Sequence, residues 1–249
     1  MKEEIFDEFY SYVKQNILPS FTLGQCAQFK AYFCELIEWN KTFNLISFKS
    51  EEAVLYRHFA DSLYAIKAFD SASFNYNQPL KIADLGTGSG MPGIPVKIAL
   101  PNAKMTLVES ITKKCAFLEN VNQKLLLNME ILNKRAEEIG NDKLYRAQYD
   151  AVLSRAVSKL SPNLEISIPL LKVGGYFAVH KTKNSAQSKE EGLYSAQNAL
   201  QCLGAKLERI IDYKLPRQDL DYCILIFKKY KDTPSQFPRK TGTPEKKPL

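Results

Sequence analysis

A strand-like run that ends on an acid and continues into three alternating glycines constrains the fold of this chain more than any other feature. Residues 81–90 read Lys-Ile-Ala-Asp-Leu-Gly-Thr-Gly-Ser-Gly. Gly86 and Gly88 can adopt backbone angles that are closed to residues with a Cβ, so the chain can turn tightly and let a ligand lie against its main chain. A dinucleotide-binding turn would have its third glycine where this chain has Met91. The spacing argues against a dinucleotide, and an ordinary strand-to-helix turn remains the other alternative.

Short apolar runs alternate with helical periods from Pro79 onward. This alternation is typical of an α/β fold with a parallel sheet and crossover helices. About ten residues without a helical period separate the last two runs, which is too few for a parallel crossover and predicts antiparallel pairing. Seven strands with the last reversed resemble the Rossmann-like sheet of class I methyltransferases that depend on S-adenosylmethionine (SAM). The expected strands are Leu80–Leu85, Met105–Glu109, Met129–Leu132, Tyr149–Leu153, Gly175–His180, Leu207–Ile211 and Cys223–Phe227.

The residues before the sheet predict an N-terminal helical extension. Apolar side chains recur at every fourth position from Ile5, and a second helical run begins with Thr22 and Gln25 in capping-box spacing. The polar residues 40–44 are expected to interrupt this second helix, and Ser50 is a candidate N-cap for a third.

Composition divides the chain into three segments. Small polar residues at 71–78 close the helical region, so the predicted division is a helical region over 1–78, a sheet domain over 79–227 and a basic, proline-rich tail over 228–249. The resemblance to the class I sheet implies that 79–227 is a SAM-binding methyltransferase domain. The tail contains four prolines and is expected to form no packed element. Such a tail either contacts nucleic acid or is a solvated terminus.

The charge of the chain is uneven along its length. The net charge is +7, and the first 78 residues contain seven basic and ten acidic side chains, whereas the last 22 contain seven and two. If the protein binds a polyanion, the sheet domain and the tail are therefore expected to supply the attraction. The alternative is that mild basicity serves solubility alone.

Cysteine usage and hydropathy indicate where the protein acts. Five scattered cysteines and two histidines give no metal-ligand spacing and no disulfide framework, so we expect free thiols and no metal. No apolar run approaches the ~20 residues of a membrane-spanning helix, and the N-terminus is acidic where a signal peptide would be basic. We therefore expect a cytoplasmic protein without a membrane partner.

Acidic residues end the first two predicted strands, where open α/β sheets bind ligands. Asp84 could meet an ammonium group on a ligand or cap the adjoining turn, and the cost of burying an unpaired acid favours the ligand. Glu109 lies about twenty residues beyond the glycines, where a carboxylate can accept both hydroxyls of a ribose. Its alternative is an exposed glutamate in a loop.

Polar residues also follow the third and fourth predicted strands. In the segment 135–138, a side-chain acceptor beside a backbone N–H could recognise an adenine edge, or the segment could be the charged first turn of a helix. Arg155 lies where the SAM-dependent fold faces the methyl group. The chain lacks the Asn/Asp-Pro-Pro-aromatic and Pro-Cys signatures used for amine and pyrimidine-carbon acceptors. That leaves acceptors that need neither device, such as guanine N7, whose in-plane lone pair can attack the methyl group without a general base. His58 and His180 could be proposed as bases, but single histidines are more often structural.

Several motifs together resemble the RsmG (GidB) family, which methylates guanine N7 in bacterial 16S ribosomal RNA. The resemblance covers nearly the whole chain. One departure is Met91, where the family usually has phenylalanine, and methionine can cover the same apolar surface. The motifs that carry the resemblance are Trp39–Leu45, His58–Leu63, Asp84–Pro95, Arg135–Glu138, Ser154–Val157 and Pro238–Pro244.

The resemblance implies a cofactor, a site and a substrate. It implies that Gly86 and Met91 line the methionine side of SAM, that Ala136 and Glu137 line its adenine, and that Arg155 borders the methyl-transfer site. It also implies that His58–Leu63 and Lys181 help to seat the RNA. The expected substrate is the small ribosomal subunit or its precursor, because an RNA duplex hides N7 in a deep groove. The enzyme is expected to be a monomer. Gly88, Glu109 and Asp84 complete the expected cofactor site, and no catalytic base is expected.

Three other functions are compatible with the sequence. A methyltransferase of the same fold could act on a ribose hydroxyl or a protein, but would need a proton acceptor that is not evident. An RNA-binding assembly factor could retain the glycine turn for structure alone. A nicotinamide-dependent enzyme is the most distant alternative.

Overall fold

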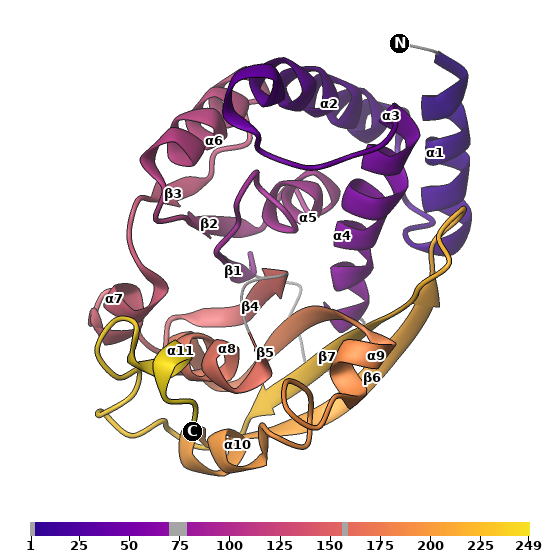
Figure 1. Cartoon of the computed structure of the whole chain (residues 1–249). Helices are drawn as coiled ribbons and strands as arrows, with labels where there is room; N and C mark the ends of the chain where they lie inside the picture. The colour runs from indigo at the N-terminus through magenta and orange to yellow at the C-terminus, as the bar shows by residue number, and fades with distance from the viewer. Residues whose placement is uncertain (1–2, 70–78, 156–158) are drawn as a thin grey trace.

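The computed structural model describes residues 3–69, 79–155 and 159–249, in which a seven-stranded sheet lies between two layers of helices (Figure 1). The strand order is β3-β2-β1-β4-β5-β7-β6. Pairs from β3 to β5 are parallel, and β7 runs antiparallel to both β5 and β6, which confirms the predicted sheet. The strands are β1 (Lys81–Leu85), β2 (Lys104–Val108), β3 (Glu130–Leu132), β4 (Tyr149–Arg155), β5 (Leu171–Thr182), β6 (Ala205–Lys214) and β7 (Asp221–Lys229).

The last three strands are longer than their apolar runs predicted. β5 begins four residues before Gly175, across an irregularity in its pairing with β4. In β6, half-buried and exposed residues alternate from Lys206 to Asp212, because this strand lies at the edge of the sheet. Because an edge strand carries polar side chains, its ends are not marked by the ends of an apolar run.

The N-terminal helices confirm the predicted caps but not the predicted break. The Thr22 hydroxyl accepts from Gln25 N, and the Gln25 side chain accepts from Thr22 N, which completes the capping box. The second helix runs three residues past Asn40, where the break was expected, and ends at Phe43; its C-cap, Asn44, is left-handed with φ 48°. Asn40 Oδ1 accepts from Ile46 N at 2.8 Å, so this polar residue supports the loop that follows. The two helices are α1 (Glu3–Asn16) and α2 (Leu23–Phe43).

A continuous helical run of changing pitch follows the predicted cap Ser50, whose hydroxyl accepts from Ala53 N at 3.1 Å. The predicted boundary at residues 71–78 lies outside the described residues. The division into three segments therefore remains a prediction. The run consists of α3 (Glu51–Ala53), the π-helical η1 (Val54–Ala60), α4 (Asp61–Leu63) and the 3₁₀-helical η2 (Tyr64–Phe69).

Two hydrophobic cores cover the two faces of the sheet. The first contains side chains of the N-terminal helices, α5 and α6 together with strand residues such as Ile82. The second contains the next residue, Ala83, with side chains of α7, α8 and α10. Trp39 of α2 meets Phe117 of α6 edge-on at a centroid distance of 5.6 Å. The helices of the sheet domain are α5 (Gly93–Ala99), α6 (Thr112–Lys124), α7 (Ala136–Asn141), α8 (Leu160–Ser167), η3 (Ile168–Leu170), α9 (Lys183–Gln187) and α10 (Gln197–Leu203).

The C-terminal tail is packed, so the prediction that it forms no packed element was wrong. Phe237 is 6% exposed in the second core, and a short helix, α11 (Thr243–Lys246), follows. Arg146 donates to the carbonyls of Thr233, Pro234 and Phe237 at 2.8, 3.1 and 2.5 Å. Arg146 lies about ninety residues earlier in the chain, so no pattern within the tail indicates that the tail packs against it. No helix among the described residues is long and apolar enough to cross a membrane.

Candidate cofactor site

The glycine turn after β1 needs its glycines. Gly86, Gly88 and Gly90 have φ angles of 63°, 61° and 93°, a region that residues with a Cβ rarely adopt. A Cβ on Gly90 would also overlap the side chain of Ile94. The Thr87 carbonyl accepts from the N–H groups of Gly90 and Met91 at 2.9 Å each, which closes the turn. The turn lies at the carboxyl end of β1, next to β4, where the strand order reverses and ligands bind in open sheets.

Asp84 is fully buried beneath this turn. Its Oδ2 accepts from the Thr87 hydroxyl at 2.5 Å and from Gly93 N at 2.8 Å, so the capping alternative is observed. Its Oδ1 has no hydrogen-bond partner among the described residues. Burial raises the pKa of Asp84 to about 7, although the two hydrogen bonds and the charge of Arg155 oppose the shift. The second oxygen is therefore a buried acceptor without a donor.

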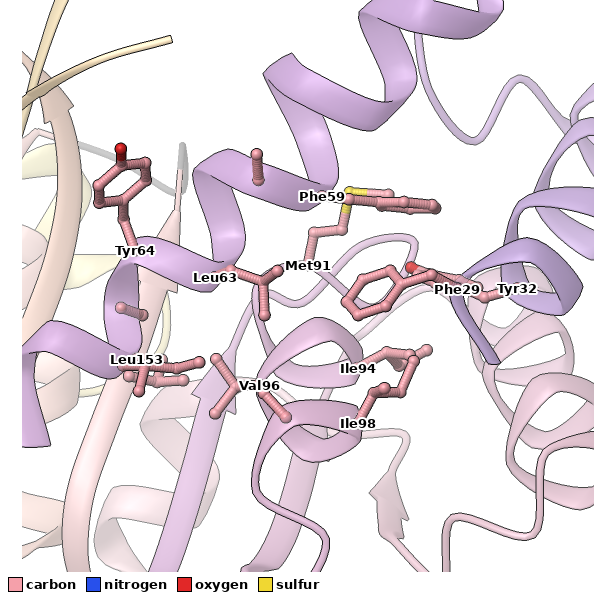
Figure 2. Close-up of a cluster of buried hydrophobic side chains, with 14 of the residues drawn as sticks. Phe29, Tyr32, Phe59, Leu63, Tyr64, Met91, Ile94, Val96, Ile98 and Leu153 are labelled. Atoms are coloured by element: carbon pink, nitrogen blue, oxygen red, sulfur yellow. The ribbon is translucent and has the colours of Figure 1, made fainter. Parts of the chain in front are cut away.

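Tyr32 of α2 ties the helical extension to the glycine turn. Its hydroxyl donates to the carbonyl of Ser89, and its ring stacks on Phe59 with centroids 4.9 Å apart. Burial raises the pKa of Tyr32 well above its ordinary value, so it remains a donor. Figure 2 shows Tyr32 and Phe59 in the hydrophobic cluster that also contains Met91. The Met91 side chain is 5% exposed and extends toward Phe59.

Glu109 follows β2 and is only 6% exposed, so the alternative of an exposed loop glutamate was wrong. Its two carboxylate oxygens accept from Gly88 N at 3.0 Å and from Ile111 N at 2.9 Å. Each oxygen retains a further lone pair. Two backbone N–H groups thus hold the carboxylate in a fixed orientation beside the glycine turn, as a group that is to receive two hydroxyls requires.

A cavity of about 500 Å³ opens at the carboxyl ends of β1, β2 and β3. It brings together Gly86, Glu109, Ala136 and Glu137, four of the residues expected to hold the cofactor. Asp84, Gly88, Met91 and Arg155 lie outside its lining. The other lining residues are Val108, Ser110, Lys134, Arg135, Pro162, Ile166, Thr241, Gly242, Pro244, Glu245 and Lys246.

The segment 135–138 divides its roles between helix and cavity. Glu138 accepts from Arg135 N at 3.2 Å and so caps the first turn of α7, in agreement with the structural alternative. Glu137 lines the cavity, where its Oε1 accepts from Gly242 N at 3.0 Å. Five residues of the tail line the cavity, and none of them was predicted as a site residue. The resemblance over Pro238–Pro244 could have indicated these residues. The proline-rich composition instead predicted an unpacked tail.

Arg155 ends β4 and contacts the helical segments η1 and α4. Its guanidinium lies 3.1 Å from Asp61 Oδ2 and donates to the His58 carbonyl and the Ser62 hydroxyl at 3.1 and 3.2 Å. Nη2 also donates to His58 Nδ1 at 2.7 Å. The Asp61 carboxylate in turn accepts from the Tyr213 hydroxyl at 2.5 Å. Arg155 is thus held by contacts with η1 and α4, and residues 156–158, which include the end of the Ser154–Val157 motif, lie outside the described residues.

Both histidines are buried and neutral. Because a guanidinium only donates, His58 Nδ1 accepts, and Nε2 carries the proton and faces the Ser47 carbonyl at 3.4 Å. Burial, together with the charge of Arg155, lowers the pKa of His58 to about 4. His180 Nε2 donates to the Asp61 carbonyl at 2.9 Å, and burial lowers its pKa as well. Lys181 follows on β5, half-buried, with its pKa lowered by burial.

Comparison with known proteins decides what this arrangement belongs to. Residues 25–220 match the family model GidB, described as rRNA small subunit methyltransferase G. The chain belongs to the rRNA small subunit methyltransferase G family. A member from Lysinibacillus sphaericus is 41% identical over 90% of this chain and 91% of its own length. Another from Alkaliphilus metalliredigens is 40% identical over 91% of each chain.

The fold agrees with this family assignment. A putative sarcosine dimethylglycine methyltransferase from Galdieria sulphuraria superposes with a TM-score of 0.55 at 13% identity, over 80% of this chain and 99% of its own. At that identity the likeness concerns the fold alone, and the fold is the class I methyltransferase sheet that the sequence predicted. Among the described residues, no group of three or more potential ligands could hold a metal ion in this member of the methyltransferase G family.

Proposed function

We propose that this methyltransferase transfers the methyl group of SAM to N7 of a guanine in small-subunit ribosomal RNA. The observation that carries the proposal is the cavity beside the positive-φ Gly86, with the buried Glu109 fixed in its wall, in a chain of the rRNA small subunit methyltransferase G family. The carboxyl end of the sheet at the strand reversal is where such folds bind their ligands.

The residues present fit SAM. The unpaired Oδ1 of the buried Asp84 suits the ammonium of the methionine part, near Gly86, Gly88 and Met91. Glu109, with one lone pair free on each oxygen, suits the two ribose hydroxyls. The first turn of α7 would border the adenine, because Ala136 and Glu137 line the cavity.

SAM supplies an electrophilic methyl group on a sulfonium, and the acceptor needs only to be aligned with it. Guanine N7 has an unprotonated in-plane lone pair at neutral pH, so no general base is required. The histidines agree with this mechanism. His58 has its free lone pair occupied by Arg155, and its pKa of about 4 keeps it neutral. The chain therefore positions the guanine rather than activating it, with Arg155 at the edge of the methyl-transfer site.

Positive charge draws the RNA to the site. A basic sheet domain and tail attract the RNA, and half-buried Lys181 lies on the strand next to that of Arg155. His58 is only 9% exposed, so we infer that it acts on the RNA through Arg155, which it orients. We further propose that the enzyme acts as a monomer in the cytoplasm, on the assembled small subunit or its precursor, where the target guanine is splayed from its stack.

Methyl mapping tests the function directly. Small subunits that lack the modification are incubated with the protein and SAM labelled in its methyl group, and the RNA is then treated with borohydride and aniline, which cleave at N7-methylguanosine. The expected result is incorporation and cleavage at one guanine of small-subunit RNA. Label on a ribose hydroxyl, another base atom or a protein would refute the acceptor. SAM binding without any methyl transfer would instead favour an assembly factor.

A further inference from the structure

The segment Phe237–Lys247, here called the C-terminal strap, forms one wall of the cavity. Thr241, Gly242, Pro244, Glu245 and Lys246 line it opposite the first turn of α7 and the residues after β2. Figure 1 shows the yellow C-terminal chain and α11 lying beside α7 and α8. The strap therefore shares the cavity with Ala136 and Glu137, the residues assigned to the adenine, whereas Asp84 lies outside the lining.

An ion pair between Arg239 and Glu165, here called the clasp, holds the strap on the sheet domain. Glu165 of α8 is fully buried, and its Oε1 accepts from Arg239 N and Nε at 2.9 and 2.8 Å. Its Oε2 accepts from Arg239 Nη2 at 2.6 Å. The hydrogen bond with Glu165 raises the pKa of Arg239. A fully buried carboxylate with a two-pronged guanidinium partner is costly to separate, so the clasp keeps the strap docked.

The strap also approaches α7 closely enough to orient its first turn. Asn141 Nδ2 donates to the Pro238 carbonyl at 3.1 Å. A Cβ on Gly140 would lie 2.7 Å from Pro238 Cγ, so the Pro238 ring packs directly against the backbone of α7. Gly242, with φ 79°, turns its N–H toward Glu137 Oε1 at 3.0 Å. The strap thus fixes the carboxylate that faces the cavity.

We propose that the C-terminal strap is part of the cofactor site, where it encloses the adenosine half of SAM and sets the orientation of Glu137. Arg239 acts as a positioning residue, because it bonds to Glu165 and to the Lys247 carbonyl and is not among the residues that line the cavity. This inference rests on the proposed function for the identity of the ligand. Loss of the clasp lowers the docked population of the strap, and the apparent dissociation constant rises in proportion.

The test separates the adenosine half from the rest of the cofactor. Binding of SAM and of 5′-methylthioadenosine, which lacks the amino-acid part, is measured by calorimetry for the full chain and for Arg239→Ala, Arg239→Lys and Lys240→Ala. We expect Arg239→Ala to raise both dissociation constants by the same factor, about tenfold or more. Arg239→Lys should restore part of the affinity, and the exposed neighbour Lys240→Ala should leave it unchanged. In methyl-transfer assays, the loss in Arg239→Ala should appear in the KM for SAM rather than in kcat.

Unchanged affinity for 5′-methylthioadenosine in a folded Arg239→Ala would overturn the inference, as would a loss confined to SAM. If Arg239→Ala does not fold, Gly140→Ala replaces it, because its Cβ displaces Pro238 while alanine favours the helix. Gly140→Ala with wild-type affinity for both ligands overturns the inference equally. A wild-type chain that binds neither ligand would refute the proposed cofactor instead.

Discussion

Replacing Asp84 by asparagine removes a buried charge without changing the shape of the side chain. The turn should stay closed in Asp84→Asn, because the amide oxygen of the new side chain can still accept from Thr87 and Gly93. What the substitution removes is the ionisation of a carboxyl whose pKa burial raises to about 7, from an ordinary value of about 3.9.

The sign of the effect follows from the direction of this shift. The folded state binds the proton more tightly than the unfolded chain, so the contribution of Asp84 to stability is complete below the unfolded pKa and is lost as pH rises through about 7. From these two values, the wild type loses about 2 kcal/mol of unfolding free energy relative to the variant between about pH 5.5 and about pH 8. His58 and His180 titrate in the opposite sense, but in both proteins, so they cancel in the difference.

The assay is urea unfolding of wild type and Asp84→Asn at the two pH values, with SAM binding measured by calorimetry on the same samples. We expect the variant to gain about 2 kcal/mol on the wild type over this interval. It should bind SAM roughly tenfold to a hundredfold more weakly, as expected for loss of a hydrogen bond between charged groups. A stability difference that does not change with pH would refute the burial of an ionisable Asp84. Unchanged SAM affinity would refute its pairing with the ammonium.

Three further substitutions test the site. Gly86→Val should abolish SAM binding while circular dichroism shows the helices intact, because φ is 63° at this cavity wall, and retained affinity would remove the cofactor from the turn. Tyr32→Phe leaves the Ser89 carbonyl without its donor and should lower the unfolding free energy by about 1–3 kcal/mol in urea titrations, a wild-type midpoint being the contrary result. Arg155→Lys cannot reproduce the contacts with Asp61 and His58 and should lower kcat about tenfold in methyl-transfer assays with SAM binding retained, so an unaltered kcat would contradict its role.

The sheet and its helical extension were predictable because their signals are local. A capping box at Thr22 predicts a helix start from neighbouring residues alone. The apolar runs before Asp84 and Glu109 likewise predict strands and place each acid at a strand end. The end of α2 was not predictable from polarity, because Asn40 hydrogen-bonds to Ile46 across the following loop.

The tail shows what local patterns omit. The tail is held in place by Glu165, 74 residues before Arg239, and by Arg146, about ninety residues before Phe237. Such pairings carry no period within the tail, so composition predicted an unpacked segment. Likewise, the two acids of the site differ in a way spacing does not reveal, since Asp84 keeps an unpaired oxygen and Glu109 has both oxygens bonded to backbone.

The packing of Trp39 against Phe117 makes the single tryptophan a reporter of one interface. Trp39 belongs to α2 and Phe117 to the helix between β2 and β3, so its fluorescence senses the contact between the helical extension and the sheet domain. Circular dichroism senses all helices and strands together. Coincident denaturation curves from the two signals would indicate that extension and sheet unfold as a single cooperative unit, whereas an earlier fluorescence transition would reveal a separable N-terminal unit.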